Sequence, residues 1–417
     1  MVSPQEREAV LTRTRNLKMA RSPHAYVRGN TVRFYEWLAE QKRGALPEGP
    51  PTWVCGDCHV GNLGPIANSK GRIEMQIRDL DQTVIGNPAH DLIRLGLSLA
   101  SAARGSDLPG VTTAHMIESM VDGYEQAFEP DWDGEDDGDV PETIRALIRK
   151  SNKRTWKHLA RERIAHTSPV IPIGKRFWPL AEEEKAEIDR LFRIEEIQGL
   201  ATKLWSRDDG APVQLVDAAY WMKGCSSLGL LRYAVLLAVG ETGVDMEFCL
   251  MDIKEATQAA APSYESAGIP ADHGERIVEG ARNLSPYLGQ RMRSGKLLGK
   301  SVFIRELLPQ DLKLEMERLT SEEATKTSRY LATVVGRAHS RQLSRDARKE
   351  WQGDLQKARS KSLDAPSWLW SSIVSLLMSH EGGYLEHCRR FALAAEKAEA
   401  PPADRTKLDA MEAAAPA

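Results

Sequence analysis

The sequence predicts an α+β fold in which a large, mainly helical part is joined to a smaller, strand-rich part. Apolar residues recur at helical spacing over much of the chain, most clearly within 88–104, 321–343 and 366–396. Apolar and β-branched residues dominate 213–237 and 246–253, which form the longest strand-like region. Helices are therefore expected both before and after one block of strands along the chain.

The first part of the chain is expected to alternate helices with a hairpin. A charged helix is predicted over 3–20, and Asn68-Ser69-Lys70-Gly71 predicts a turn followed by a strand over 73–77. Asn87-Pro88 then begins a helix, on which Leu92, Leu95 and Leu99 share one face. These patterns divide the chain into four expected segments: a helical part at 1–205, a small strand lobe at 206–310, a helical remainder at 311–398 and a disordered tail at 399–417.

The composition is that of an ordinary globular protein. The chain has 417 residues, of which 41% are hydrophobic and 28% charged, with a net charge of −3. This charge predicts neither a nucleic-acid nor a membrane-surface partner. No apolar run approaches the roughly 20 residues of a membrane span, and the polar N-terminus does not match a secretory signal. A cytoplasmic location is therefore expected.

One short stretch, Val54-Cys55-Gly56-Asp57-Cys58-His59-Val60-Gly61-Asn62-Leu63-Gly64, concentrates the chemically useful residues. Asp57 and Asn62 are separated by four residues, which is the spacing of the kinase catalytic loop. Asp79 and Asp81 follow after the expected hairpin. Carboxylate and amide oxygens are the ligands that Mg²⁺ prefers, so a metal–phosphate site is expected here.

These residues resemble a known group of enzymes. Gly-Asp-x-His-x-x-Asn followed by Asp-Leu-Asp is similar to the signature of aminoglycoside phosphotransferases, choline kinases and other kinase-like phosphotransferases. A closer resemblance runs from Ser22-Pro23 through 55–64 and 79–81 to Asp91-Leu92-Ile93-Arg94. It is to a bacterial family called domain of unknown function 2252, which is grouped with the protein-kinase-like fold.

The resemblance implies a two-lobed kinase-like fold with an antiparallel sheet in its small lobe. It also implies an ATP- and Mg²⁺-dependent transfer of phosphate to an unidentified hydroxyl acceptor. Asp57 would accept or orient the acceptor proton, and His59 would brace the loop by hydrogen bonding. Asn62 and Asp79 would hold Mg²⁺, and Asp81 would assist as a ligand or a neighbour of the ligands.

The nucleotide-binding parts are expected downstream of this loop. Lys223 to Gly229 contains Gly224, Ser226, Ser227 and Gly229, which would cover the phosphates. Lys254 ends an apolar strand, as the phosphate-contacting lysine of kinases does. A helix is expected within 273–293, with Glu275 and Glu279 one turn apart on the same face. Glu279, or Glu275 as second choice, would pair with the lysine, and the strand and hinge at 302–307, including Glu306, would meet the adenine. Because these parts follow the catalytic loop, the expected fold is circularly permuted.

Three neighbouring residues receive supporting roles. Asp91 is expected to fix the loop from the start of a helix, where an acid is favoured. Arg94 and Arg28 are expected to tie down acidic loops, and Arg28 could also reach a phosphate.

The acidic run at 129–139 lacks the EF-hand register and is expected to be a solvated loop, although it would also suit a cationic acceptor.

Other readings of the same residues remain open at this point. A nucleotide-binding pseudokinase or an enzyme that transfers AMP would carry a similar set. Cys55-Gly56-Asp57-Cys58-His59 also matches a haem attachment pattern, and it could bind zinc or form a redox pair. The five cysteines are an odd number in a chain without a recognisable signal, which favours free thiols.

Overall fold

The structure is a computed structural model. It describes residues 4–129, 140–163, 170–204, 206–225, 227–241, 246–264, 268–312, 314, 319–359 and 364–393. Three predictions lie outside these residues: nearly all of the acidic run at 129–139, the tail at 399–417, and Ser226 of the glycine segment.

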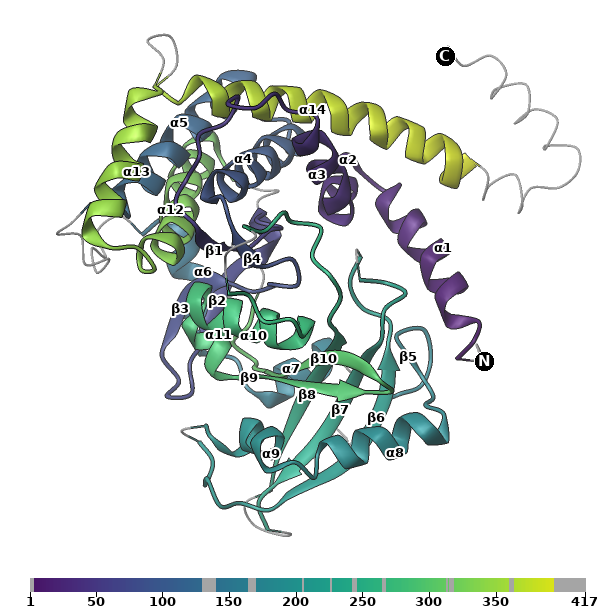
Figure 1. The fold of residues 1–417 in the computed structure, drawn as a ribbon. Helices are drawn as coiled ribbons and strands as arrows, with labels where there is room; N and C mark the ends of the chain where they lie inside the picture. The colour runs from purple at the N-terminus through teal and green to yellow at the C-terminus, as the bar shows by residue number, and fades with distance from the viewer. Residues whose placement is uncertain are drawn as a thin grey trace, which may run out of the picture.

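The helical part gathers on one side of the molecule (Figure 1). Its elements are α2 (Pro23–Gly29), α3 (Thr31–Ala39), α4 (Pro88–Gly105), α5 (Gly110–Gln126), α6 (Glu142–Asn152), α12 (Ser321–Ser340), α13 (Arg345–Lys357), α14 (Ser367–His387) and the short η3 (Cys388–Leu393). The helix predicted at 88–104 is confirmed as α4. Its Leu92, Leu95 and Leu99 are fully buried, as their shared face predicts.

A six-stranded antiparallel sheet forms the other side, with the strand order β5-β6-β7-β8-β10-β9. The strands are β5 (Phe177–Trp178), β6 (Val213–Trp221), β7 (Arg232–Val239), β8 (Glu247–Glu255), β9 (Met292–Leu297) and β10 (Lys300–Leu307). Five of them fall within the strand lobe expected at 206–310, and the predicted strands at 213–237 and 246–253 become β6, β7 and β8.

Helices cover both faces of the sheet. On one face, α8 (Glu182–Leu191) and α9 (Glu195–Thr202) pack on apolar residues of alternate strand positions, below the sheet in Figure 1. On the other face, α7 (Trp156–Arg163) covers one end only. The helices α10 (His273–Leu284) and α11 (Pro286–Gln290) connect β8 to β9. The sheet unit therefore also includes helices that precede residue 206.

Two small antiparallel pairs lie between the helices and the sheet (Figure 1). One joins β1 (Thr52–Val54) to β4 (Val84–Gly86), and the other is the hairpin of β2 (Leu63–Ala67) and β3 (Ile73–Ile77). The predicted turn at 68–71 closes this hairpin, with an Asn68 N–H to Arg72 carbonyl bond of 2.9 Å.

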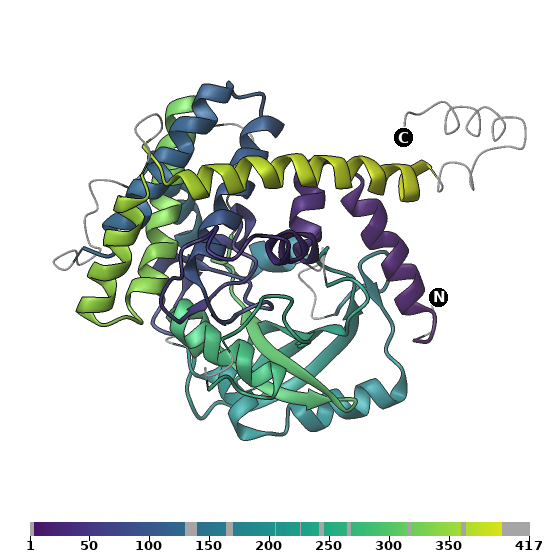
Figure 2. The same cartoon turned by 45° about the horizontal axis from the view of Figure 1, so that its top comes forward.

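The first helix, α1 (Arg7–Met19), runs beside the end of α14, as Figures 1 and 2 both show. His387 Nε2 lies 2.8 Å from the Asn16 carbonyl, and the Tyr384 hydroxyl donates to the Ala20 carbonyl at 3.1 Å. At the other end of α1, Leu11 is buried in the core beneath the sheet. The helix therefore bridges the two sides of the molecule.

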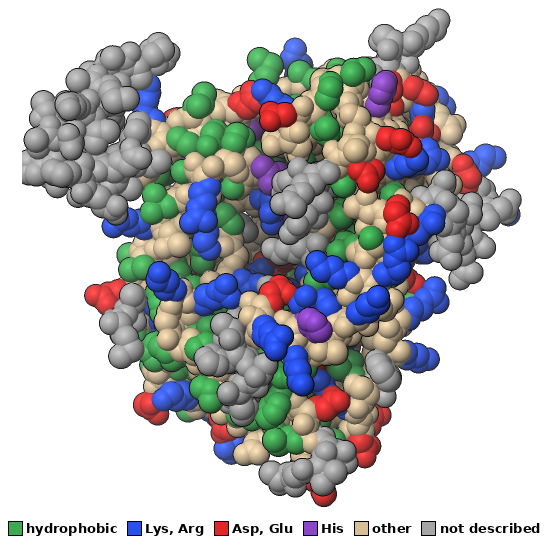
Figure 3. All heavy atoms as spheres, turned by 180° about the vertical axis from the view of Figure 1, so that it is seen from behind, with side chains coloured by type: hydrophobic (Ala, Val, Ile, Leu, Met, Phe, Trp, Pro, Cys, Tyr) green, Lys and Arg blue, Asp and Glu red, His purple; other side chains and the backbone are tan. Residues whose placement is uncertain are grey.

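Within the described ranges, no helix combines the length and the apolar character needed to cross a membrane. Viewed from behind, Lys and Arg side chains gather across the middle of the molecule, where the helices meet the sheet, around a hollow (Figure 3). An anionic ligand would meet a positive local field on this face, despite the net charge of −3.

Candidate functional site

The two acidic segments lie side by side because β1 pairs with β4 and β2 pairs with β3. Residues 55–62 connect β1 to β2 and end in the 3-10 turn η1 (Val60–Asn62), whereas residues 78–83 connect β3 to β4. Each connection runs from one of the two small sheets to the other. Local strand pairing therefore brings the carboxylates of the two segments together.

The loop at 55–57 is fixed by Asp91 in the first turn of α4. The N–H groups of Cys55 and Gly56 donate to the Asp91 carboxylate at 2.6 and 3.0 Å. Gly56 has φ +75°, and a Cβ there would lie 2.2 Å from the Gln82 carbonyl oxygen. Only glycine fits this crossing of the two segments, and the role predicted for Asp91 is observed.

A buried polar chain continues from Asp91 into the helices. His339 Nε2 lies 3.1 Å from the Asp91 carboxylate, and His339 Nδ1 shares a 2.8 Å hydrogen bond with the Tyr124 hydroxyl. The Trp351 indole N–H donates to the same hydroxyl at 3.4 Å. Helices α4, α5, α12 and α13 thus all contribute to the position of the loop.

Asp57 is held by a fully buried arginine. Arg94 donates to Asp57 Oδ1 through Nε at 3.1 Å and through Nη2 at 2.7 Å, and Nη2 also donates to the Val27 carbonyl. This agrees with the tying role predicted for Arg94. The second oxygen, Oδ2, lies 3.8 Å from His59 Nε2. It is the oxygen of Asp57 that Arg94 leaves unused.

His59 does not brace the loop in the way that was predicted. Its Nε2 is too far from Asp57 for a hydrogen bond, and its buried Nδ1 has no hydrogen-bond partner. Burial lowers the pKa of His59 to about 3, against the opposing effect of the Asp57 charge, and the charges of Arg28 and Arg94 act in the same direction as burial. The imidazole is therefore neutral, and it contributes packing to the loop.

Asn62 is oriented by its own loop. Its side-chain amide donates to the Asp57 carbonyl at 3.0 Å, and its backbone N–H donates to the His59 carbonyl at 2.8 Å. The Asn62 carbonyl accepts from Arg78 N at 2.7 Å, which ties the loop to the second acidic segment. Because the NH₂ group is used within the loop, the amide oxygen is left as a ligand atom.

Lys254 meets the second acidic segment from β8. Its Nζ lies 3.3 Å from Asp79 Oδ1 and also donates to Asp81 Oδ2, although the two segments are far apart in the sequence. The lysine is 3% exposed. Asp81 Oδ1 is buried and has no hydrogen-bond partner. An acid pair with one unsatisfied oxygen remains beside the ammonium group.

The two carboxylates differ in their electrostatics. Burial and the neighbouring Asp79 charge raise the pKa of Asp81 to about 7, against the attraction of Lys254. Burial opposes ionisation of Asp79 as well, but Lys254, a hydrogen bond with Asp81 and the charge of Arg305 hold its pKa well below the ordinary value. Two acids that share a site and repel each other in this way do not ionise equally, because the charge of one raises the pKa of the other.

The sheet supplies further charges that the sequence analysis missed. Arg232 forms a bidentate pair with Asp252, at 2.8 and 2.6 Å, and Arg305 lies 3.6 Å from the same carboxylate. Asp252 is two residues before Lys254, so both project from one face of β8. This alternation was visible in the sequence and could have indicated the cluster.

The glycine segment at 223–229 reaches the same region through Ser227, whereas Gly224 and Gly229 do not line the cavity. Gly224 and Gly229 have φ values of +104° and +109°, which favour glycine. Lys18 of α1 donates to the Gly224 carbonyl at 3.2 Å. Ser227 lines the same cavity as the acids.

Five of the predicted site residues line one cavity of about 420 Å³. Asp57, Asn62, Asp79 and Asp81 line it together with Ser227. Its outer wall comes from the two ends of the chain, and includes Arg15, Asn16, Met19, His387 and Phe391. The two terminal helices thus help to enclose the candidate site, which the sequence did not indicate.

Two predicted cofactor residues lie elsewhere. Glu279 pairs with Arg282 at 3.1 Å on the exposed side of α10, so it is not the partner of Lys254, and Glu275 also lies away from the lysine, lining a separate surface pocket. The inward face of α10 instead carries Arg276, which donates to the carbonyls of Asp81, Thr83 and Thr257. The helix was predicted, but its rotation about its axis was not.

Glu306 is also committed to other contacts. Its carboxylate forms an ion pair with Arg207 at 3.0 Å, and its carbonyl accepts from Arg291 at 2.9 Å. Arg291 thus occupies a backbone group that was expected to meet an adenine. The carboxylate and the carbonyl of Glu306 therefore both have partners within the protein.

The two cysteines of the loop are buried thiols. Cys55 and Cys58 are free and buried. A hydrogen bond that the Cys55 thiol donates to Cys58, together with burial, raises the pKa of Cys55 well above its ordinary value. The same bond lowers the pKa of Cys58, but burial leaves that pKa raised. Among the described residues, no three His, Cys, Asp or Glu side chains gather as a metal-binding group. Raised thiol pKa values disfavour a redox pair, because the thiolate is the reactive form.

Comparison with protein families identifies one relationship. The profile of a family described as uncharacterized proteins conserved in bacteria, DUF2252, matches residues 7–390. The chain belongs to the DUF2252 family. This confirms the resemblance to domain of unknown function 2252. Neither the curated proteins nor the solved structures contain a match. The DUF2252 match includes every residue that lines the cavity except Phe391, and it spans all of α1 and α14.

Proposed function

We propose that this DUF2252 protein is a nucleotide- and Mg²⁺-dependent phosphotransferase with a kinase-like active site. One observation carries the proposal: Lys254 lies 3.3 Å from Asp79, in the region that also holds Asp57 and Asn62. A kinase places its strand lysine and its metal-binding aspartate around the same phosphates. Lys254 is far from these residues in the sequence, so only the fold brings them together.

The order of elements in the sheet supports the same function. The glycine segment joins β6 to β7, Lys254 ends β8, a helix follows, and β10 leads back toward the helical part. This is the order glycine loop, strand lysine, helix and hinge that kinases use. Because the loop with Asp57 precedes them in this chain, the proposal includes a circularly permuted kinase-like fold.

The residues present suit a magnesium ion. Mg²⁺ in phosphotransferases is commonly bound by one or two carboxylates together with substrate phosphates. Asp79, Asp81 and the Asn62 amide oxygen would supply the protein ligands, and the unsatisfied Asp81 oxygen gives a specific reason for a cation there. Bound Mg²⁺ would neutralise the charge of the phosphates.

The remaining residues would bind and orient the reactants. Lys254 would turn from the acids to the α and β phosphates, and the N–H groups near Ser227 would cover them. Asp57 Oδ2 would accept a hydrogen bond from the acceptor hydroxyl, since Arg94 occupies only the other oxygen. His59 would not act as the base, because its pKa of about 3 reflects a buried imidazole that holds protons weakly.

The first test is a thermal-shift titration with ATP, ADP or GTP, each with and without Mg²⁺. A ligand present at 100 times its Kd stabilises the folded state by about 2.7 kcal/mol, which is readily measured. We expect stabilisation by one nucleotide with Mg²⁺, and its loss in Asp79→Asn. Glu279→Gln is the matched control, since Glu279 lies on the exposed side of α10. No stabilisation by any nucleotide would contradict the proposal.

The second test measures turnover. An acceptor panel is incubated with ATP and Mg²⁺, and products are analysed by mass spectrometry. Transfer of the γ-phosphate adds about 80 Da, whereas transfer of AMP adds about 329 Da. We expect the smaller addition and its loss in Asp57→Asn. Nucleotide binding without transfer to any acceptor would instead identify a pseudokinase.

A further inference from the structure

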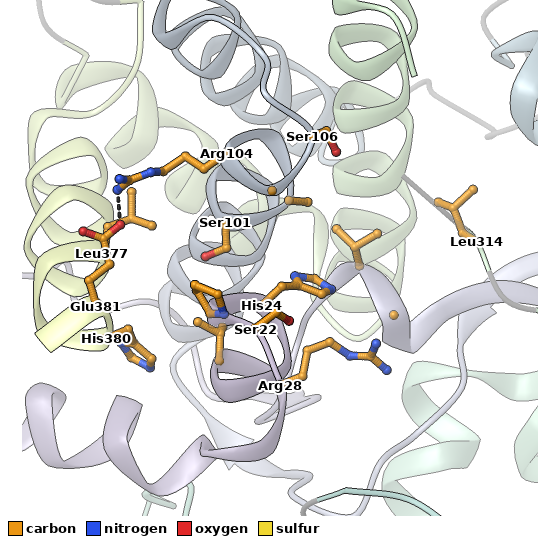
Figure 4. A pocket seen from close by; sticks show the side chains of 16 residues that line it. Ser22, His24, Arg28, Ser101, Arg104, Ser106, Leu314, Leu377, His380 and Glu381 are labelled. Atoms are coloured by element: carbon orange, nitrogen blue, oxygen red, sulfur yellow. Dashed lines mark ion pairs between the residues drawn. The ribbon is translucent and has the colours of Figure 1, made fainter. Parts of the chain in front are cut away.

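A second cavity lies on the other side of the loop that carries Asp57. Its volume is about 520 Å³, and α2, α4 and α14 enclose it (Figure 4). Val60 and Gly61 of the loop form part of its wall, between Asp57 and Asn62 in the sequence. The lining is largely apolar and includes Pro23, Val27, Val60, Ala102 and Leu377. A pocket of this size and character is typical of small-molecule sites.

Arg28 is the chief polar group at the loop side of this cavity. Its guanidinium packs on Gly61, where a Cβ would lie 2.9 Å from Arg28 Cζ. Its Nε is buried without a hydrogen bond, and no described carboxylate forms an ion pair with it. A partly buried guanidinium without a counter-ion favours an anionic ligand.

Arg104 and His380 add no unbalanced charge to the cavity. Arg104 is paired with Glu381 at the rim, as the dashed line in Figure 4 marks. His380 is 2% exposed, and burial lowers its pKa to about 4, so it is neutral. His24 also lines the cavity and, like Arg28, lowers the pKa of the adjacent His59. Arg28 thus leaves one positive charge without a partner.

His380 adds a hydrogen-bond acceptor on the opposite wall. Its Nδ1 lies 2.9 Å from the Leu376 carbonyl, so this nitrogen carries the proton of the neutral ring. Its Nε2 is buried without a partner. Figure 4 shows the ring among the residues that line the cavity. An unsatisfied buried acceptor is costly unless a ligand donates to it.

We propose that this cavity binds an amphiphilic organic carboxylate that carries a hydroxyl group on its apolar body. The carboxylate pairs with Arg28, the apolar body packs on Val27, Val60 and Leu377, and the hydroxyl donates to His380 Nε2. Binding here requires no nucleotide. The inference therefore stands or falls separately from the phosphotransferase proposal.

The test is isothermal titration of the full-length protein with 10-hydroxydecanoate, without nucleotide. We expect one site per chain and at least tenfold weaker binding in Arg28→Met, which keeps the length of the side chain but removes its charge. Arg104→Met is the matched control, because Glu381 already neutralises that arginine. Its affinity should change less than twofold. Leu377→Trp, which fills the cavity, should abolish binding.

Three results of the titrations would overturn the proposal. One is the absence of saturable binding to the wild type, and another is unchanged affinity in Arg28→Met with folding verified by circular dichroism. The third is binding of decyltrimethylammonium as tight as that of the carboxylate. Sedimentation with phosphatidylglycerol vesicles separates a free amphiphile from a lipid surface. We expect no retention, and retention that depends on Arg28 would replace the small-molecule site by a membrane contact.

Discussion

Gly56 shows how a single residue sets the geometry of the candidate site. The loop and the second acidic segment cross there, and the Gln82 carbonyl occupies the space of a Cβ. The Cys55 and Gly56 N–H groups can then both reach Asp91. The glycine was visible in the sequence, but its close contact with a residue 26 positions later, at 82, was not.

Gly56→Ala should therefore destabilise the protein by more than the cost of placing alanine at a positive φ. A left-handed non-glycine residue costs about 1–3 kcal/mol, and the clash with Gln82 adds to this. Gly44→Ala is the matched control, since Gly44 has φ +79° but open space around its Cβ position. Urea unfolding should give a clearly larger loss for Gly56→Ala. Equal losses would show that the crossing relaxes without cost.

His380 predicts a component of the pH dependence of stability. Its folded pKa is about 4, below the ordinary 6.5, because burial disfavours the charged ring. The unfolded chain therefore binds more protons between these values, so stability is present above pH 6.5 and is lost as the pH falls toward 4. The difference corresponds to about 3 kcal/mol at most.

His380→Gln should remove this component. The free energy of unfolding of wild type and variant, measured by urea titration from pH 7.5 to 4.5, should converge as the pH falls. Two parallel curves would mean that His380 does not contribute to acid destabilisation.

At the scale of elements, the site depends on helices that never reach the cavity. Trp351 on α13, Tyr124 on α5 and His339 on α12 form the buried chain that ends at Asp91 on α4. The helices at 88–104 and 321–343 were recognisable from their apolar periodicity. The polar residues were not recognisable as a network, because each hydrogen-bonded pair is more than 200 positions apart in the sequence and meets only in the packed core.

Tyr124→Phe tests this chain. It removes one hydroxyl and leaves His339 Nδ1 and the Trp351 N–H without their partner, which should cost about 1–3 kcal/mol. Tyr287→Phe is the control, because its hydroxyl bonds the partly exposed Glu74 at the surface. Thermal unfolding should show the larger loss for Tyr124→Phe. A loss no greater than that of Tyr287→Phe would contradict a structural role for the chain.

The misplacement of Glu279 also belongs to the element scale. Amphipathic spacing predicted a helix with two acids on one face, and α10 is that helix. Which face turns inward is decided by contacts with the segment 81–83 and with Thr257, which accept from Arg276. Helical periodicity defines faces relative to one another, not relative to a partner that is distant in the sequence.

At the scale of the whole molecule, α1 couples the sheet to the helices around the site. Leu11 is buried beneath the sheet, Lys18 bonds the glycine segment, and Asn16 accepts from His387. The first and last helices of the described chain thus form one wall of the cavity. This wall could not be predicted, because neither helix carries a motif.

Leu11→Ala should destabilise the protein by about 2–5 kcal/mol, as expected for a buried leucine. It should also weaken nucleotide-dependent thermal stabilisation, since Lys18 and Arg15 lie on the same helix. Val10→Ala is the matched control, because Val10 is 39% exposed on the neighbouring position. If both variants unfold at the same denaturant concentration, α1 does not pack as the structure describes.

The sequence by itself determined the elements and the chemistry of the short segments. Periodicity predicted α4 and the strands, and the spacing of Asp57, Asn62 and Asp79 indicated a metal–phosphate site, because such spacing is a local property of the chain. Only the tertiary structure decided the partners. Lys254 meets Asp79 and Asp81, Glu279 turns outward, and α1 closes the cavity. These outcomes depend on packing between distant segments, which no local pattern encodes.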